Sequence, residues 1–268
     1  MNLFDLSKEI SPTYTAKFWR AVLEFNLIEK NDKIALGFSG GKDSIYLLFL
    51  LSSLKEKFPF PFEVEALHIE NGFASPEENQ HMREKLSKYC DELKIPLTIH
   101  PLPMEEIWDS KKEKSPCFIC ARYRRGALAR IAKEKGFNKL ALAHHLDDAV
   151  ETFMMSLFQS GQIKTFAPRA YMDRSDITVI RPLCFLRETE VIDAMTKLPW
   201  EPIKNPCPYS ESTKRMDTRN WLKEQEEIFP GLFQKLSRSL REDQVKDLWP
   251  PLPNRKELKE KFEAFWGK

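Results

Sequence analysis

The 268-residue sequence lacks any hydrophobic run of the roughly 20 residues that a transmembrane helix needs. Residues 1–17 also lack the basic and then apolar order of a secretory signal peptide. A disulfide framework is disfavoured, because the five cysteines are an odd number and follow no secretion signal. Neither charge sign dominates, since 42 Lys and Arg against 40 Asp and Glu leave a net charge of +2. These absences predict a cytoplasmic protein with no membrane partner, in which any nucleic-acid surface is local.

Glycine is scarce, with 9 residues, whereas 18 prolines divide the chain into segments. Short apolar runs typical of buried strands alternate with segments of helical spacing. The expected strands are residues 34–38, 63–69, 97–100, 139–143 and 178–182, and the expected helices are residues 12–28, 44–54, 76–93, 121–135, 147–158, 191–198 and 218–227. This alternation predicts an α/β fold with a doubly wound, mostly parallel sheet and a small helical C-terminal appendage.

A glycine loop joins the first expected strand to the next helix. Its sequence is Ser39-Gly40-Gly41-Lys42-Asp43-Ser44. Backbone at two glycines can approach a phosphate closely, and the helix N-terminus and its dipole favour an anion. Two serine hydroxyls and the charge of Lys42 add further phosphate-binding groups. The loop is shorter than a Walker loop, which disfavours a kinase-type site. An ordinary glycine turn is the alternative interpretation.

A second candidate element runs from the strand at residues 139–143 into the next helix. Its sequence is Ala143-His144-His145-Leu146-Asp147-Asp148-Ala149-Val150-Glu151-Thr152. Imidazoles and carboxylates therefore gather at the carboxyl end of a strand, where open parallel sheets bind ligands. Taken alone, these residues are also consistent with a metal site or with capping of the helix by Asp147.

Three cysteines form a further candidate site. Cys117 and Cys120 make a CxxC pair at the start of a helix, and Cys207 lies far downstream between two prolines. A lone CxxC is ambiguous among zinc, a redox pair, an iron–sulfur cluster and chance. Cys90 and Cys184 lie in apolar segments and are expected in the core.

Basic and aromatic residues flank these motifs. The basic residues could line a groove that reads RNA phosphates, and the aromatic ones could stack an everted base. A solvated charged face is the alternative for each basic residue. Arg124, four residues beyond Cys120, is expected to lie nearest to a nucleotide or a cluster. The basic residues are Arg122, Arg124, Arg125, Arg130, Lys164, Arg169, Arg174, Lys214, Arg215 and Arg219, and the aromatic ones are Tyr123, Trp200 and Tyr209.

The glycine loop resembles that of the PP-loop superfamily, whose adenine nucleotide alpha hydrolase-like members cleave ATP to AMP and pyrophosphate and adenylate their substrates. The resemblance implies that the loop residues Ser39, Gly40, Gly41, Lys42, Asp43 and Ser44 bind ATP. It places the adenine near Ile69, and it makes Asp43 the acidic residue for Mg²⁺ or catalysis, which suits a hard cation. A plain strand end is an equal alternative for any role of His68 or Glu70.

The second element resembles the Gly-His-x-x-Asp-Asp-x-x-Glu-Thr signature of PP-loop tRNA thiolases, with Ala143 in place of glycine. The match implies that Ala143 and Asp148 lie at the ATP, with His145 as a weaker candidate. An alanine at the glycine position leaves the affinity for ATP there open.

The cysteine motifs are similar to those of the tRNA 2-thiocytidine synthetase family: Pro-Cys-x-x-Cys before Arg-Arg-Gly, and a later Pro-Cys before an Arg- or Lys-bearing helix. Residues 25–28 and 180–183 share the likeness, which covers about residues 15–235. It implies a [4Fe-4S] cluster held by Cys117, Cys120 and Cys207. Three protein ligands would leave one iron open to hold sulfide. Ser210 replaces a further cysteine of many relatives, and zinc-finger cysteine pairs typical of 2-thiouridine synthetases are missing, which favours the thiocytidine branch.

What the resemblance implies is ATP-dependent thiolation of C2 of an anticodon-loop cytidine in tRNA, with Asp43 and the three cysteines as catalytic residues. It requires a sulfide donor such as a cysteine desulfurase system, and the apolar N-terminal helix is consistent with a homodimer. We expect an N-terminal helical segment at 1–29, a PP-loop ATP-binding domain at 30–190 and a helical region carrying the third cysteine at 191–268. One alternative is an enzyme that thiolates or adenylates another base or a small molecule, which includes 2-thiouridine synthesis and lysidine-type ligation. The other is a non-enzymatic module that senses a metal or the redox state.

Overall fold

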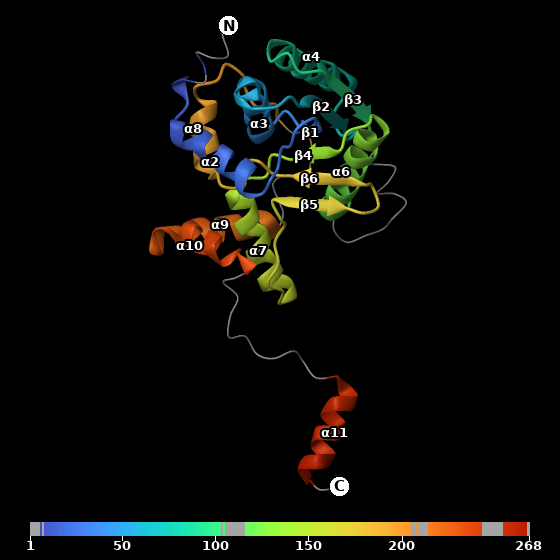
Figure 1. Ribbon diagram of the computed structural model, residues 1–268, viewed down its shortest axis with the longest axis vertical. Coiled ribbons are helices and arrows are strands. Elements are labelled where there is room, and N and C mark those ends of the chain that lie inside the picture. The colour runs from blue at the N-terminus through green and yellow to red at the C-terminus, as the bar shows by residue number, and fades with distance from the viewer. Residues whose placement is uncertain are drawn as a thin grey trace.

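A six-stranded sheet forms the centre of the computed structural model, which describes residues 6, 8–102, 104, 116–204, 207, 214–242 and 254–266. The strand order is β3-β2-β1-β4-β6-β5 (Figure 1). Five strands are parallel: β1 (Lys33–Gly37), β2 (Glu63–Glu70), β3 (Leu97–Pro101), β4 (Lys139–Ala141) and β6 (Ile177–Ile180). The edge strand β5 (Arg169–Met172) runs antiparallel to β6. The order reverses between β1 and β4, and ligands of open α/β sheets bind at the carboxyl ends of such strands.

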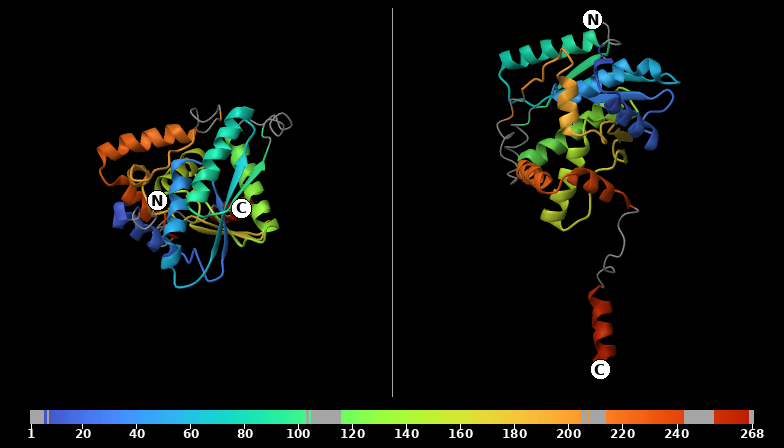
Figure 2. Two further views of the ribbon diagram at one scale, coloured as in Figure 1. Left: turned by 90° about the horizontal axis from the view of Figure 1, so that it is seen from above. Right: turned by 90° about the vertical axis from the view of Figure 1, so that its left-hand side faces the viewer.

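Alternate residues of the strands pack into two hydrophobic cores, one on each face of the sheet. Ile34 and Leu36 of β1 pack toward α2 (Pro12–Glu24), α3 (Lys42–Ser53), α4 (Pro76–Glu92) and α8 (Glu188–Met195). Ala35, between them, packs toward α6 (Pro116–Glu134) on the opposite face. Figure 2 shows α3 and α4 on one side of the strands and α6 on the other. This period-two burial is what a parallel sheet covered on both faces requires.

The remaining helices pack on each other or stand alone. A third core joins α7 (Leu146–Ser160), α9 (Lys214–Ile228) and α10 (Leu232–Ser239). A short 3₁₀ helix, η1 (Lys55–Lys57), follows α3, and α11 (Arg255–Trp266) has no buried residue. No helix in the described ranges combines the length and apolar character needed to cross a membrane.

The predicted α/β class, with a mostly parallel sheet and a small group of C-terminal helices, is confirmed. All five predicted strands are present, with shifts of a few residues at their ends. The prediction missed β5, which has only four residues and alternates between exposed and half-buried positions, so that no fully buried run marks it as a strand. It also missed α10 and α11.

Candidate functional site

The predicted phosphate loop lies between β1 and α3, at the point where the strand order reverses. Gly41 precedes the first turn of α3, and within the described chain no side chain caps this helix end. Ser44 Oγ donates to Gly41 O (2.9 Å) and lies 3.1 Å from Ser39 Oγ. The first N–H groups of α3 and two serine hydroxyls therefore converge on one side of the loop, an arrangement that suits an anion.

Gly40 adopts a backbone conformation that other residues rarely take, with φ of +77°. Its carbonyl accepts a hydrogen bond from Ile203 N (2.8 Å), so the segment after α8 runs against the loop. A Cβ at position 40 would lie 3.0 Å from Ile203 Cδ1 and 3.1 Å from Leu86 Cδ2. Both the backbone angle and the packing therefore require glycine here.

We expect Gly40→Ala to lower the free energy of unfolding by about 1–3 kcal/mol, because it strains the backbone and crowds Ile203. Denaturant-induced unfolding measures this change. Gly126→Ala in α6 is the matched control, since no described atom outside its own helix backbone lies within 4 Å of the added Cβ. The Gly126→Ala variant should have a free energy of unfolding that is about 0.5–1 kcal/mol higher. Equal effects of the two substitutions would contradict the role assigned to Gly40.

A cavity of about 320 Å³ opens beside this loop at the carboxyl ends of β1 and β4. One part of its wall is apolar, with Gly37, Leu67, Leu128 and Leu142. The other part is polar and charged. Of the ten residues predicted at ATP, seven line this cavity: Ser39, Asp43, Ser44, Ile69, Arg124, Ala143 and Asp148. The other three, Gly40, Gly41 and Lys42, complete the loop at its edge. An apolar slot next to a phosphate loop suits a nucleotide.

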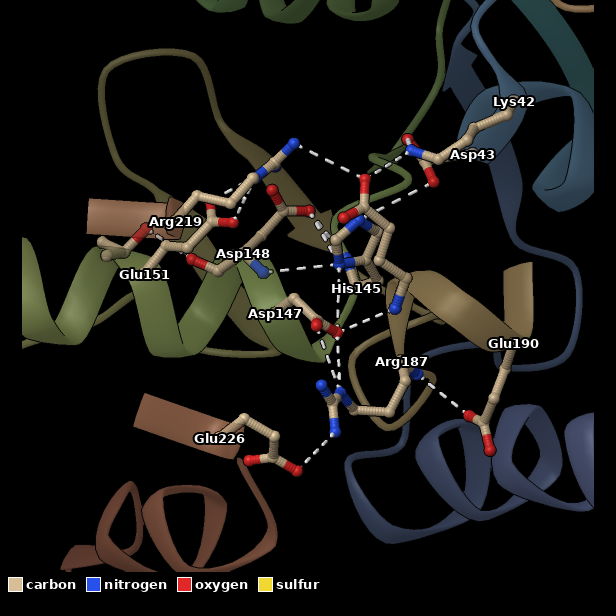
Figure 3. Close-up of polar contacts among 12 residues, drawn as sticks. Lys42, Asp43, His145, Asp147, Asp148, Glu151, Arg187, Glu190, Arg219 and Glu226 are labelled. Atoms are coloured by element: carbon tan, nitrogen blue, oxygen red, sulfur yellow. Dashed lines mark hydrogen bonds and ion pairs between the residues drawn. The ribbon is translucent and has the colours of Figure 1, made fainter. Parts of the chain in front are cut away.

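Lys42 is held by two carboxylates (Figure 3). Its Nζ lies 3.0 Å from Glu188 Oε1 and 3.1 Å from Asp43 Oδ2. Burial alone would lower the pKa of Lys42, but these carboxylates raise it above its ordinary value. Burial likewise opposes ionisation of Glu188, yet Lys42 holds the pKa of that carboxyl below its ordinary value. The sequence prediction missed Glu188, which lies far from the loop in the chain.

The second predicted element shapes the opposite wall. His145, rather than Asp147, caps α7: its Nδ1 accepts from Asp148 N (3.3 Å), and its own N–H donates to Asp148 Oδ2 (2.9 Å). Asp147 instead accepts from Arg187 Nε at 3.1 Å, as Figure 3 shows. Capping by Asp147 is therefore wrong, and Asp147 ties α7 to the residue before α8.

His144 also lines the cavity, and the sequence prediction did not select it. Arg181 Nε donates to His144 Nδ1 (3.3 Å), which leaves Nε2 as the protonated nitrogen of a neutral ring. Burial lowers the pKa of His144 to about 4. His144 is therefore neutral at physiological pH.

A second cavity, of about 260 Å³, adjoins the first and shares Ser39, Ile69 and Arg124 with it. His68, Asn71 and Met82 also line it. The segment after α8 contributes Ile203 and Lys204. His68 Nδ1 lies 2.7 Å from Phe38 O and so carries the proton, while the buried Nε2 has no hydrogen-bond partner among the described residues. Arg124 Nε is likewise buried and unpartnered there. Buried polar atoms of this kind mark places where a ligand can bind.

The cysteines fall into two groups. Cys90 and Cys184 are buried, and burial raises the pKa of each thiol to about 12, as expected for core residues. Cys120 and Cys207 are half-buried. Cys120 precedes Arg124 by about 6 Å of helix rise, and Cys207 is within about 11 Å of chain from Lys204. Each is therefore close in the chain to a residue of the second cavity, although neither is among the residues that line it.

Cys117 begins the same helix as Cys120, but its side chain lies outside the described part of the chain. Within the described part, no three His, Cys, Asp or Glu side chains are grouped to hold a metal. The predicted triad therefore stays a prediction.

Aromatic and basic side chains were predicted to form an RNA-binding surface. Trp200 is only 2% exposed and donates from Nε1 to Glu92 Oε2 (2.7 Å), so it is a core residue and its predicted role in stacking a base is wrong. Tyr209 lies outside the described residues.

The basic residues predicted for the RNA surface differ in where they lie. Arg130 pairs with Glu134 on the surface, and Arg169 pairs there with Glu29. Arg215 lines the nucleotide cavity itself.

Comparison with known proteins identifies the family of this chain. The family model described as a PP-loop domain matches residues 13–226. The tRNA-cytidine(32) 2-sulfurtransferase of Pelobacter propionicus is 36% identical over 225 residues, which cover 82% of each chain. That of Geobacter metallireducens is 37% identical over 239 residues, which cover 85% of this chain and 89% of the relative.

A solved structure is also similar: the U34-tRNA thiolase NcsA from Methanococcus maripaludis with its [4Fe-4S] cluster. The match has a TM-score of 0.73 and 26% identity, and it covers 90% of this chain and 81% of that one. With the phosphate loop at the reversal of strand order, the chain therefore belongs to the PP-loop family and, within it, to the transferases named tRNA-cytidine(32) 2-sulfurtransferases.

Proposed function

We propose that this protein thiolates C2 of an anticodon-loop cytidine in tRNA and uses ATP to activate that position. The observation that carries the proposal is the pair of adjoining cavities that share Arg124, of which one lies beside the phosphate loop. Reactants bound in the two cavities would therefore lie next to each other. The relatives named as tRNA-cytidine(32) 2-sulfurtransferases support the choice of base.

ATP would occupy the first cavity. Its adenine packs against Gly37, Leu128 and Leu142, and its phosphates lie at the start of α3 beside Ser39 and Ser44. The cytosine would occupy the second cavity, where His68 Nε2 accepts a hydrogen bond from its exocyclic amine. The carbonyl at C2 would then face the ATP in the first cavity.

The reaction has two steps. The C2 oxygen of cytosine attacks the α-phosphorus of ATP, so that an O–P bond forms and pyrophosphate leaves. Sulfide then bonds to C2, the C2–O bond breaks, and AMP leaves with the oxygen. The cationic Arg124 lies between the two cavities and would stabilise the charge on the α-phosphate during both steps.

Asp43 fits a role in holding Mg²⁺. One carboxylate oxygen, Oδ1, is buried and has no hydrogen-bond partner among the described residues, although it belongs to a residue that lines the cavity. Carboxylate oxygens together with substrate phosphates are the usual ligands of Mg²⁺. Mg²⁺ bound there would neutralise charge on the phosphates.

The cysteine set fits a [4Fe-4S] cluster, since thiolates are its usual ligands. Cys120 and Cys207 are close in the chain to residues of the second cavity, and Cys117 is one helical turn before Cys120. The cluster would supply the sulfur that replaces the C2 oxygen. A sulfide donor such as a cysteine desulfurase system would restore that sulfur after each turnover.

Nucleoside mass spectrometry of tRNA tests this function. We expect 2-thiocytidine to appear when the gene is expressed in a host that lacks this nucleoside. The Asp43→Ala variant, expressed at the same level, should leave the nucleoside absent. If the protein holds its cluster and binds ATP but no 2-thiocytidine appears, the proposal is wrong. Formation of 2-thiouridine instead would also contradict it.

A further inference from the structure

Arg215, near the start of α9, reaches the polar wall of the nucleotide cavity. Its Nη2 donates to Asp148 Oδ1 (2.8 Å) and lies 3.3 Å from Asp148 O. Burial opposes ionisation of Asp148, but the charge of Arg215 helps to hold the pKa of that carboxyl below its ordinary value. An arginine from the C-terminal helices is therefore part of the nucleotide site.

Glu151 fixes the direction of this guanidinium. The carboxylate of Glu151 is only 1% exposed, and it accepts from Arg215 Nε (2.7 Å) and from Arg219 Nε (2.6 Å). A buried carboxylate needs such partners, because an unpaired one costs several kcal/mol. Arg219, which lies beside Glu151 in Figure 3, is also 3.5 Å from Glu188, the partner of Lys42. This network attaches α9 to α7 and to the phosphate loop.

The charge balance of the cavity explains what Arg215 does there. Asp43 and Asp148 repel a triphosphate. Lys42 pairs with two carboxylates and so does Arg215, but of the two only Arg215 is among the described residues that line the cavity, together with Arg124. The Nε and Nη2 atoms of Arg215 donate to Glu151 and Asp148, which leaves Nη1 of the guanidinium to donate to a phosphate oxygen.

We propose that Arg215 binds the phosphate groups of ATP and that Glu151 positions it for this role. The prediction from sequence spacing, that Arg215 reads RNA phosphates, is replaced by this assignment. The inference rests on the proposed function only in taking ATP as the ligand of the first cavity.

Arg215→Met in the full-length, cluster-loaded protein should raise the Kd for ATP by about 10–100-fold. A loss of this size is expected because the variant lacks one or two hydrogen bonds to a charged group. Isothermal titration without tRNA measures this. Lys223→Met is the matched control: it removes a positive charge from the same helix, but Lys223 is exposed and does not line the cavity. Its Kd for ATP should stay within about threefold of the unmodified protein's, because it makes no contact with the ligand.

A double-mutant cycle separates positioning from a general loss of structure. Glu151→Gln alone should weaken ATP binding, but Glu151→Gln combined with Arg215→Met should bind ATP no more weakly than Arg215→Met. A purely structural role of Glu151 would make the two losses add. If Arg215→Met does not fold, Arg215→Lys is measured instead; it keeps the charge but loses the paired geometry, so a rise in Kd of about 3–10-fold is expected.

A different pattern of ATP and tRNA binding would contradict the proposed role of Arg215. If Arg215→Met leaves the Kd for ATP unchanged but weakens tRNA binding and reduces its dependence on salt, Arg215 belongs to the RNA surface and the proposal is wrong. The ATP measurement needs no tRNA. A failure to form 2-thiocytidine would therefore refute the proposed function and leave this inference standing.

Discussion

Asp43→Ala is expected to slow the release of pyrophosphate by about 10²–10³-fold, the usual loss when one electrostatic group aimed at the reacting centre is removed. Asp43 lies in the first turn of α3 and on the wall of the nucleotide cavity. Its Oδ2 is engaged by Lys42, and its buried Oδ1 has no hydrogen-bond partner among the described residues and lies 3.7 Å from His145 Nε2. Removal of this carboxylate would take away the oxygen proposed to hold Mg²⁺ at the phosphates.

The measurement is the rate of pyrophosphate release with tRNA and ATP at several Mg²⁺ concentrations. Asp43→Asn keeps the size of the side chain but not its charge, so its reaction should need more Mg²⁺ for half-maximal rate. Glu188→Gln is a matched control, because Glu188 also holds Lys42 but does not line the cavity. That variant should keep the ordinary Mg²⁺ dependence. Unchanged turnover of Asp43→Ala would refute the assignment.

The sequence predicts the local features of this fold well. The parallel strands β1 and β6 are short, rich in apolar residues and mostly buried, and the loop Ser39–Ser44 carries its phosphate-binding groups within six consecutive residues. Such features depend on neighbours in the chain, so their pattern is visible without a structure. The edge strand β5 was missed, because its four residues are exposed or half-buried and are too few to give a clear pattern.

Contacts between distant segments were not predictable in the same way. Lys42 pairs with Glu188, and Arg215 pairs with Asp148 and Glu151, across separations that no periodic pattern encodes. Sequence proximity to Cys207 suggested an RNA surface for Arg215, but the packing of α9 on α7 turns it into the cavity. Trp200 was misplaced for the same reason, since its burial against Glu92 depends on α4.

Replacement of Cys207 with serine should reduce thiolation to background while the Kd for ATP stays within about threefold, because the change is away from the nucleotide wall. Cys207 is half-buried, three residues beyond Lys204 of the second cavity. A hydroxyl is a poor substitute for a thiolate as a ligand of iron in a cluster. Loss of iron and of the visible absorption of the cluster should accompany the loss of 2-thiocytidine.

Cys184→Ala is the control for this prediction, since Cys184 is buried and burial raises its pKa to about 12, so that it is a neutral thiol at physiological pH. It should keep its iron, its ATP affinity and its thiolation activity, with a loss of stability as the main effect. If Cys207→Ser retains full activity, the cluster does not depend on Cys207. If both variants lose activity and iron together with their thermal stability, the effect of Cys207→Ser is a loss of packing. Only selective loss of iron and thiolation in Cys207→Ser, with ATP binding intact, agrees with a ligand role and separates the chemistry at C2 from the activation by ATP.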